Sequence, residues 1–214
     1  LKNDISSKDA YFGSSAFMSL IHSLQLESSG ADISFAAPLS FNSSKSAREL
    51  NFQDLLELYP YENQLYVISM TGLEIKNYLE YSYSKWVHKY PSESGHMLQI
   101  NEQGWDGSAR FSNPFFNFDS AAGVIYEVDI TKGDGERVNI LSMSSGVPFY
   151  LDKMYRVALT SYRASGGGNL LSLGAGIDKE ELKGRESEKY KDIRELLYDK
   201  IKSEGTIEAH NLNN

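Results

Sequence analysis

Two short segments of the sequence place aromatic side chains beside polar ones, a combination suited to binding a flat heterocycle. One segment spans residues 114–119 and contains Phe116 and Asn117, and the other spans residues 159–163 and contains Tyr162. Two rings that converge from separate loops could clamp a nucleobase, and such stacking contributes about 1–3 kcal/mol per base. The alternative is that both rings pack in the core or at its rim, as most aromatic residues do. The sequence leaves both interpretations open.

Three consecutive glycines, Gly166, Gly167 and Gly168, follow the second aromatic segment. They do not form a phosphate-binding P-loop, because no Lys-Ser/Thr pair comes after them. Glycine allows a tight exit from a strand, and it also allows the backbone to approach a planar ligand closely. On spacing alone we favour the tight exit.

The residue groups needed for independent catalysis are missing. The four histidines are scattered, and His22 lies in a helical pattern, where a packing or capping role is expected. Cysteine is absent, which excludes thiolate metal sites and cysteine nucleophiles. Ser82 and Lys85 match an S-x-x-K string but lack its companion motifs. We therefore expect no metal site, no cofactor and no catalytic residue in this chain.

Composition narrows the class of partner. The chain has 214 residues and a formal net charge of −8, with 29 acidic against 21 basic side chains. A groove for a nucleic-acid polymer needs a basic stripe, so no such partner is expected, whereas a single nucleotide needs only a local pair of cations. No apolar run reaches the roughly 18 residues of a membrane span. The residues after Leu1 are polar and charged, so we expect no leader peptide there.

Hydrophobic periodicity and turn residues predict the elements that must position the aromatic segments. Thr71 and Glu74 match a helix-capping box, Gly30 ends a helical pattern, and residues 132–135 indicate a hairpin turn. The predicted helices cover residues 14–26, 51–58, 71–86 and 188–203, and the predicted strands cover residues 33–37, 64–70, 124–130, 137–143 and 155–162. Residues 39–50 are expected to form a loop, and residues 88–123 a long excursion. The pattern predicts one α/β (α+β) domain in which helices flank mixed sheets.

Several separated motifs, in consistent order over about residues 10–175, resemble the C-terminal domain of the bacterial 5′-nucleotidases. The sequences of these motifs are most similar to the 2′,3′-cyclic-nucleotide phosphodiesterase/3′-nucleotidase branch. The matching segments are residues 31–38 (ADISFAAP), 58–65 (LYPYENQL), 71–72 with 79–80, 117–119 (NFD), 123–129 (GVIYEVD) and 162–168 (YRASGGG).

The resemblance implies a substrate-binding domain that presents nucleotide to a metallophosphatase. In that family an N-terminal metallophosphatase domain holds the divalent metals, and the C-terminal domain binds the nucleotide. The implied partners are therefore a nucleotide or nucleoside and a metallophosphatase domain or chain. Residues 1–30 would correspond to the linker, residues 31–205 to the C-terminal domain and residues 206–214 to a polar tail. Such nucleotidases generally work in the periplasm or at the cell surface, and this localisation is implied here too.

The resemblance also assigns site residues. Phe116 and Tyr162 match the two rings that sandwich the base, and Asn117 follows the first ring, where it would meet the base edge. Gly166, Gly167 and Gly168 match the loop beside the second ring. Relatives specialised for 5′-nucleotides often carry an Asp near the ribose hydroxyls at the place of Gly168, where this chain continues with Asn169.

The phosphate-binding motif departs from the family pattern. Many relatives carry Asn-Gly-Gly-x-Arg after the strand that corresponds to residues 32–36, and this chain does not. Lys45 or Arg48 would be the substitute, although lysine lacks the bidentate fork of arginine. The other interpretation is that both are solvated loop cations and that the metallophosphatase holds the phosphate.

Three hypotheses remain open from the sequence. The chain completes a metal-dependent phosphohydrolase by binding its nucleotide, or it is a stand-alone nucleoside-binding module without catalysis. In the third, it is a structural domain in which the aromatic pair survives only as packing. Hydrolysis by the chain alone is the least expected outcome.

Overall fold

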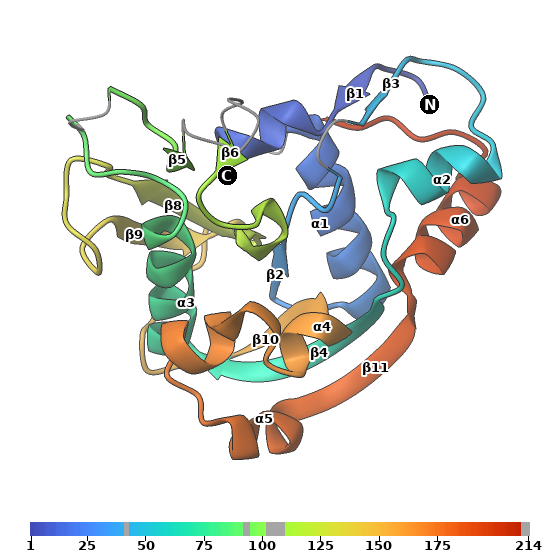
Figure 1. Cartoon of the computed structure of the whole chain (residues 1–214). Coiled ribbons are helices and arrows are strands. Elements are labelled where there is room, and N and C mark those ends of the chain that lie inside the picture. The colour runs from blue at the N-terminus through green and yellow to red at the C-terminus, as the bar shows by residue number, and fades with distance from the viewer. Residues whose placement is uncertain (41–42, 92–94, 102–109, 211–214) are drawn as a thin grey trace.

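A five-stranded mixed sheet lies at the centre of the computed structural model, which describes residues 1–40, 43–91, 95–101 and 110–210 (Figure 1). The strand order is β11-β4-β10-β2-β7. These strands are Glu186–Asp192 (β11), Gln64–Thr71 (β4), Met154–Thr160 (β10), Ile33–Ala36 (β2) and Ser120–Ala122 (β7). Strands β10 and β2 run parallel, and the other neighbours are antiparallel. The sheet confirms the predicted mixed architecture.

Helices cover both faces of this sheet. One face carries α1 (Ala16–Ser29), α2 (Phe52–Leu58) and α6 (Ile193–Glu204), and the other carries α3 (Gly72–Ser84) and a π-helical turn, Leu170–Gly174 (Figure 1). Side chains that alternate along each strand divide into two apolar clusters. In β10, Val157 and Leu159 belong to the cluster with α3, whereas Ala158 belongs to the cluster with α1.

Short elements complete the described structure. Pairs of strands outside the main sheet are β1 (Ile5–Ser6) with β3 (Ser44–Lys45), β5 (Ile100–Asn101) with β6 (Arg110–Phe111), and β8 (Val124–Val128) with β9 (Val138–Met143). The remaining helical segments are α4 (Ser161–Ala164), α5 (Lys179–Arg185) and 3₁₀ turns at Lys8–Tyr11, Phe115–Asn117 and Gly167–Asn169.

The local signals at helix ends and at the hairpin are confirmed. Gly30 adopts the left-handed conformation (φ 59°) that ends α1. Thr71 and Glu74 form a reciprocal capping box at the start of α3. Strands β8 and β9 form the predicted antiparallel hairpin.

Two predicted boundaries are wrong, and both errors have a local cause. The strand predicted over 155–162 ends at Thr160, because the Thr160 hydroxyl accepts the backbone N–H of Arg163 and starts α4. The helix predicted over 188–203 begins only at Ile193, where the Asp192 carboxylate accepts the N–H of Arg194. The residues before it form β11, which pairs with β4.

Three predicted segments fall partly outside the described residues, namely the loop 39–50, the excursion 88–123 and the tail 206–214. In the described part of the tail, Ile207 and Ala209 are buried. The Lys2 N–H donates to the Ile207 carbonyl at 2.8 Å. The N-terminal residues and the tail therefore pack together. Across the described residues, no helix combines the length and apolarity that crossing a bilayer requires.

Candidate functional site

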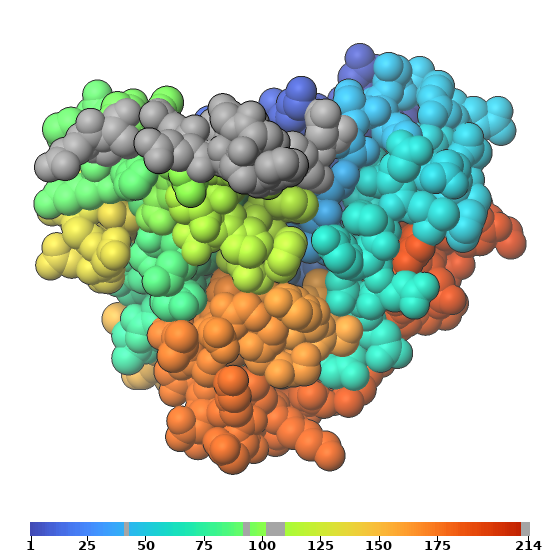
Figure 2. Space-filling view, viewed as in Figure 1, coloured from blue at the N-terminus to red at the C-terminus, as the bar shows by residue number. Residues whose placement is uncertain are grey.

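The two aromatic segments meet at one end of the central sheet. Strands β10 and β2 are parallel, so their carboxyl ends lie at the same edge, where the antiparallel strands β4 and β7 begin. Four connecting segments gather there, near residues 37–39, 61–63, 115–119 and 160–163. Figure 2 shows the segments around 60, 115 and 165 meeting near the middle of the visible face. Strand topology alone thus brings together loops that are distant in sequence.

Phe116 and Tyr162 line one cavity of about 190 Å³ at this edge. The other lining residues are Leu39, Tyr61, Glu62 and Asn63. Tyr162 is 42% exposed, and Phe116 is half-buried beside Tyr61, whose ring centre lies 6.4 Å away. Pockets for drug-sized ligands measure roughly 300–1,000 Å³, so this one suits a single ring system rather than a whole extended ligand.

The guanidinium of Arg163 connects the two aromatic loops beneath the cavity. Its Nη2 donates to the carbonyl oxygen of Phe116 at 2.6 Å, and its Nη1 donates to the carbonyl oxygen of Gly167 at 3.1 Å. Nη1 also donates to the Asn117 side-chain oxygen at 3.1 Å. Nε and Nη2 donate to the two carboxylate oxygens of Asp119, at 2.9 and 2.7 Å. All five N–H donors of the guanidinium therefore have an acceptor.

Asp119 and Arg163 form an ion pair inside the protein, since their exposed side-chain fractions are only 1% and 3%. Burial by itself would lower the pKa of Arg163, but the Asp119 carboxylate outweighs burial and raises that pKa above its ordinary value. Asp119 also accepts the Tyr78 hydroxyl, and burial followed by the Asp119 charge raises the pKa of Tyr78 well above its usual range. Arg163 therefore stays charged and Tyr78 stays neutral at any ordinary pH.

Comparison with known proteins places this chain in a known family. The model of the family described as "5′-nucleotidase, C-terminal domain" matches residues 1–173. The chain belongs to this family. The resemblance read from the separated sequence motifs is thereby confirmed.

Relatives of the domain are named for nucleotide phosphoester hydrolysis. The "Trifunctional nucleotide phosphoesterase protein YfkN" of Bacillus subtilis is 32% identical over 133 residues, 57% of this chain and 8% of that protein. The "2′,3′-cyclic-nucleotide 2′-phosphodiesterase/3′-nucleotidase" of Salmonella typhimurium is 31% identical over 135 residues, 56% of this chain and 19% of that protein. The domain thus spans less than a fifth of these relatives.

Solved structures share the fold. A putative 5′-nucleotidase from Staphylococcus aureus aligns with 99% of this chain and 39% of its own, with a TM-score of 0.75 and 21% identity. The NAD nucleotidase of Haemophilus influenzae aligns with 92% of this chain and 31% of its own, with a TM-score of 0.62 and 19% identity. The central sheet and its helices are therefore those of a 5′-nucleotidase C-terminal domain.

The consecutive glycines of the domain are explained by the aromatic site itself. A Cβ on Gly167 would lie 2.5 Å from the Tyr162 ring. A Cβ on Gly168 would lie 2.6 Å from both Arg163 Nη1 and the Asn117 side-chain oxygen, and Gly168 has a φ of +72°. Glycine at these two positions leaves room for the ring and the guanidinium.

The other predicted binding residues sit around this site. Asn117 uses its side-chain oxygen for Arg163, and its amide nitrogen has no hydrogen bond to any residue that the structure describes. Asn169 is exposed, adopts a left-handed conformation (φ 59°), and donates its N–H to the Gly166 carbonyl. Gly166, Gly167, Gly168 and Asn169 do not line the cavity that Phe116 and Tyr162 share.

The predicted phosphate contacts, Lys45 and Arg48, lie elsewhere and have partners. Lys45 pairs with Asp54 at 2.9 Å and with Glu57 at 2.5 Å, and Arg48 pairs with Asp54 at 2.6 Å. These carboxylates lie on α2, and they raise the pKa values of both cations through hydrogen bonds and charge. The described residues that line the cavity shared by Phe116 and Tyr162 include no cation. Arg163 lines a smaller adjoining pocket, and its donors are all used.

Sequence reasoning did not single out Tyr61, Asp119 or Arg163 for the site. A signal was present, since each lies inside a motif that carried the family resemblance. Their roles depend on contacts between segments far apart in the chain, which spacing cannot reveal.

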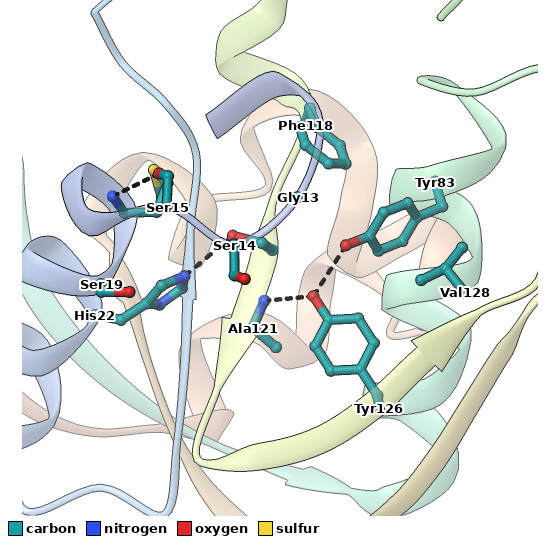
Figure 3. A pocket seen from close by; sticks show the side chains of 12 residues that line it. Gly13, Ser14, Ser15, Ser19, His22, Tyr83, Phe118, Ala121, Tyr126 and Val128 are labelled. Carbon is teal, nitrogen blue, oxygen red and sulfur yellow. Dashed lines mark hydrogen bonds between the residues drawn. The ribbon is translucent and has the colours of Figure 1, made fainter. Parts of the chain in front are cut away.

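A second cavity, of about 150 Å³, lies between α1 and β7 beside α3 and β8 (Figure 3). His22 lies at its wall, where Nδ1 is 2.9 Å from the Ser34 hydroxyl and Nε2 is 3.1 Å from the Ser120 hydroxyl. Because Ser34 donates its proton to Gln25, Nδ1 carries the imidazole proton and Nε2 accepts from Ser120. Burial lowers the pKa of His22 to about 4, against a small opposing effect of Asp119.

His22 therefore serves as a neutral packing group with two hydrogen bonds. Within the ranges that the structure describes, no three His, Asp or Glu side chains gather to hold a metal ion.

Proposed function

We propose that this domain binds the base of a nucleotide between Phe116 and Tyr162 and presents the phosphate to a metallophosphatase domain or chain. The observation that supports the proposal most strongly is that these two rings, carried by separate loops, line one cavity. Stacking contributes about 1–3 kcal/mol per base, and the free amide of Asn117 offers a donor for a base edge. The divalent metals and the hydrolytic step belong to the partner.

The distribution of charge supports this division of labour. The described cavity has no cation with a free donor, and Glu62 at its wall adds a negative charge. Such a cavity suits the uncharged heterocycle and not the phosphate. The family membership and the names of the relatives point to a 5′-nucleotidase or 2′,3′-cyclic phosphodiesterase/3′-nucleotidase reaction, in nucleotide catabolism in the periplasm or at the cell surface.

The test is to mix the domain with a candidate metallophosphatase in Mn²⁺ or Zn²⁺ and to measure hydrolysis of AMP, 3′-AMP and 2′,3′-cyclic AMP. We expect the mixture to hydrolyse nucleotide faster than the metallophosphatase alone, and we expect the gain to disappear with a Phe116→Ala, Tyr162→Ala double variant. The same rate with wild-type and doubly substituted domain would contradict the proposal.

A stand-alone nucleoside-binding module is the second candidate, because a described cavity without a free cation is equally compatible with a ligand that carries no phosphate. Calorimetry with adenosine separates the candidates when read together with the hydrolysis assay. Nucleoside binding without any gain in hydrolysis supports the module. If no ligand binds, and alanine at the two ring positions changes stability alone, the rings serve only for packing.

A further inference from the structure

We propose that Arg163 and Asp119 are positioning residues that set the gap between Phe116 and Tyr162. This inference rests on the proposed function, because the gap matters only if a base occupies it. Neither charged group needs to touch the ligand. Their effect is to hold the backbones of the two aromatic loops at one separation.

The first step is that one planar group contacts both loops. The Arg163 guanidinium binds the carbonyl of Phe116 on one loop and the carbonyl of Gly167 on the other, at 2.6 and 3.1 Å. Because the guanidinium is rigid and its donors lie in one plane, these bonds fix the two carbonyls relative to each other. Arg163 also follows Tyr162 directly in the chain, so fixing Arg163 also fixes the point at which the Tyr162 side chain leaves the backbone.

The second step is that this connection is anchored to the core. The Ser82 hydroxyl of α3 donates to the Asp119 carbonyl at 2.8 Å and accepts the Asp119 N–H at 2.9 Å. The Tyr78 hydroxyl donates to the Asp119 carboxylate, and the Tyr78 ring stacks on Phe35 of β2 with centres 4.1 Å apart. These contacts therefore fix the position of the aromatic loops relative to α3 and to the central sheet.

The third step is that the ring of Tyr162 is supported from within the protein. The Arg163 guanidinium carbon lies over this ring at 5.3 Å from its centre. The backbone of Gly167 packs so closely against the ring that a Cβ on Gly167 would have no space. Tyr162 nevertheless remains 42% exposed. A ring with protein packed against it and open surface remaining is prepared to stack on a ligand without rearrangement.

Lysine cannot reproduce this arrangement. An ammonium group has three donors, whereas the acceptors around Arg163 are two carboxylate oxygens, one amide oxygen and two backbone carbonyls. Arg163→Lys therefore keeps the charge that balances Asp119 but releases at least part of the link between the loops. This separates a role in geometry from a role in charge.

The experiment compares wild type with Arg163→Lys and Gly168→Ala. The second substitution leaves the ion pair chemically intact but inserts a Cβ 2.6 Å from Arg163 Nη1. Gly176→Ala is its matched control, because Gly176 has a similar φ of +77° and open space around it. Arg185→Lys is the control for the loss of a guanidinium pair, since Arg185 binds Glu74 away from the cavity.

Two readouts are taken on each folded variant, namely adenosine affinity by calorimetry and hydrogen–deuterium exchange of residues 115–119 and 162–168. We expect Arg163→Lys and Gly168→Ala to weaken adenosine binding by about ten- to a hundredfold, because small displacements of a binding geometry are costly. Exchange should accelerate in both loops together and stay unchanged in the β8–β9 hairpin. Gly176→Ala and Arg185→Lys should behave like wild type in both readouts.

Failure of the inference differs from failure of the proposed function. If wild type binds adenosine and both test variants bind equally well, or if their two loops exchange as in wild type, the positioning role is wrong. If wild type binds no nucleoside, the proposed function fails, and the exchange data still decide whether Arg163 links the loops. Should Arg163→Lys not fold, Gly168→Ala against Gly176→Ala gives the decision.

Discussion

At the level of single residues, the candidate site separates the rings that line the cavity from the groups that hold them. Phe116 and Tyr162 line the cavity, while Asp119 and Arg163 lie beneath it with almost no exposed surface. Breaking a buried ion pair by removing one partner typically costs about 3–5 kcal/mol, because the other charge is left buried and unpaired. Substituting a ring should therefore weaken ligand binding, whereas substituting Asp119 or Arg163 should weaken binding and also lower the free energy of unfolding.

The rings give the first prediction at this scale. Tyr162→Ala and Phe116→Ala should each weaken adenosine binding by about 1–3 kcal/mol, the value of one stacking partner. Tyr162→Ala should lower the unfolding midpoint in urea less than a substitution in the buried core would, because Tyr162 keeps 42% of its surface exposed. Tyr150→Ala, at an exposed tyrosine outside the cavity, is the control for calorimetry. Equal affinity for all three variants would argue against stacking.

His22 gives a prediction for the dependence of stability on pH. Its pKa in the folded state is about 4, below the ordinary 6.5, because burial disfavours the charged ring. The unfolded chain therefore takes up a proton first, so the stability present above about pH 6.5 is lost as the pH falls toward 4. We expect the wild type to lose about 2 kcal/mol from this group between about pH 7.5 and about pH 5.

Urea unfolding at the two pH values measures this loss, and His22→Gln is the comparison. The variant is expected to be less stable overall but to show a smaller difference between the two pH values. An unchanged difference would mean that other groups cause the pH dependence.

The sequence alone was sufficient to identify the two candidate rings, but it did not identify the residues that hold the rings in place. Phe116 and Tyr162 stand out because aromatic residues beside polar ones near a loop are a local pattern. Arg163 appears in the sequence as an ordinary charged residue, and its five acceptors come from residues 116, 117, 119 and 167. Only the strand pairing of β10, β2 and β7 brings those acceptors together.

At the level of elements, the junction between β7 and β8 is a connection with no room for a side chain. Gly123 has a φ of +92°, and a Cβ there would lie 2.2 Å from the Asp32 carbonyl oxygen, which belongs to the segment entering β2. Gly123→Ala should therefore destabilise the domain by more than the roughly 1 kcal/mol that a left-handed alanine costs. Gly146→Ala, with a φ of +82° and no atom within 4 Å, isolates that conformational cost.

Urea unfolding of both glycine variants provides the comparison. We expect Gly146→Ala to lower the free energy of unfolding only by the conformational cost of a left-handed alanine. Gly123→Ala should lower the free energy of unfolding clearly more. Similar losses would mean that the backbone at the junction shifts without cost.

Elements with strong local signals were predictable, and elements decided by their neighbours were not. The cap of α1 at Gly30 and the capping box of α3 were correct because they involve residues a few positions apart. Residues 188–192 of β11 were predicted as helix, because Tyr190 continues the helical spacing of Ile193, Leu197 and Ile201 and ESEKYKD carries no apolar face that would indicate a strand. It is an edge strand held by pairing with β4, where charged side chains are common.

At the level of the whole molecule, the net charge and the cavity lead to a prediction about phosphate. The chain carries a net charge of −8, and the two predicted phosphate contacts, Lys45 and Arg48, are paired with carboxylates on α2. We expect the domain alone to bind AMP no more tightly than adenosine in parallel calorimetric titrations. AMP binding about tenfold tighter or more would place a phosphate ligand within this chain.

The fold itself follows from one sheet with helices on both faces, and that much was predicted from periodicity and from the family resemblance. The site could be predicted only as two candidate rings, since the sequence does not specify whether distant loops meet. Their shared cavity depends on the parallel pairing of β10 with β2, a contact between strands more than a hundred residues apart.

The most direct test of the account is an NMR measurement of contacts between adenosine and the two rings. The protein would carry isotope labels in phenylalanine and tyrosine, with Phe116 and Tyr162 assigned by substitution. The account predicts nuclear Overhauser effects from the base protons to both of these rings in the bound state. Saturable adenosine binding with effects to neither ring would contradict it.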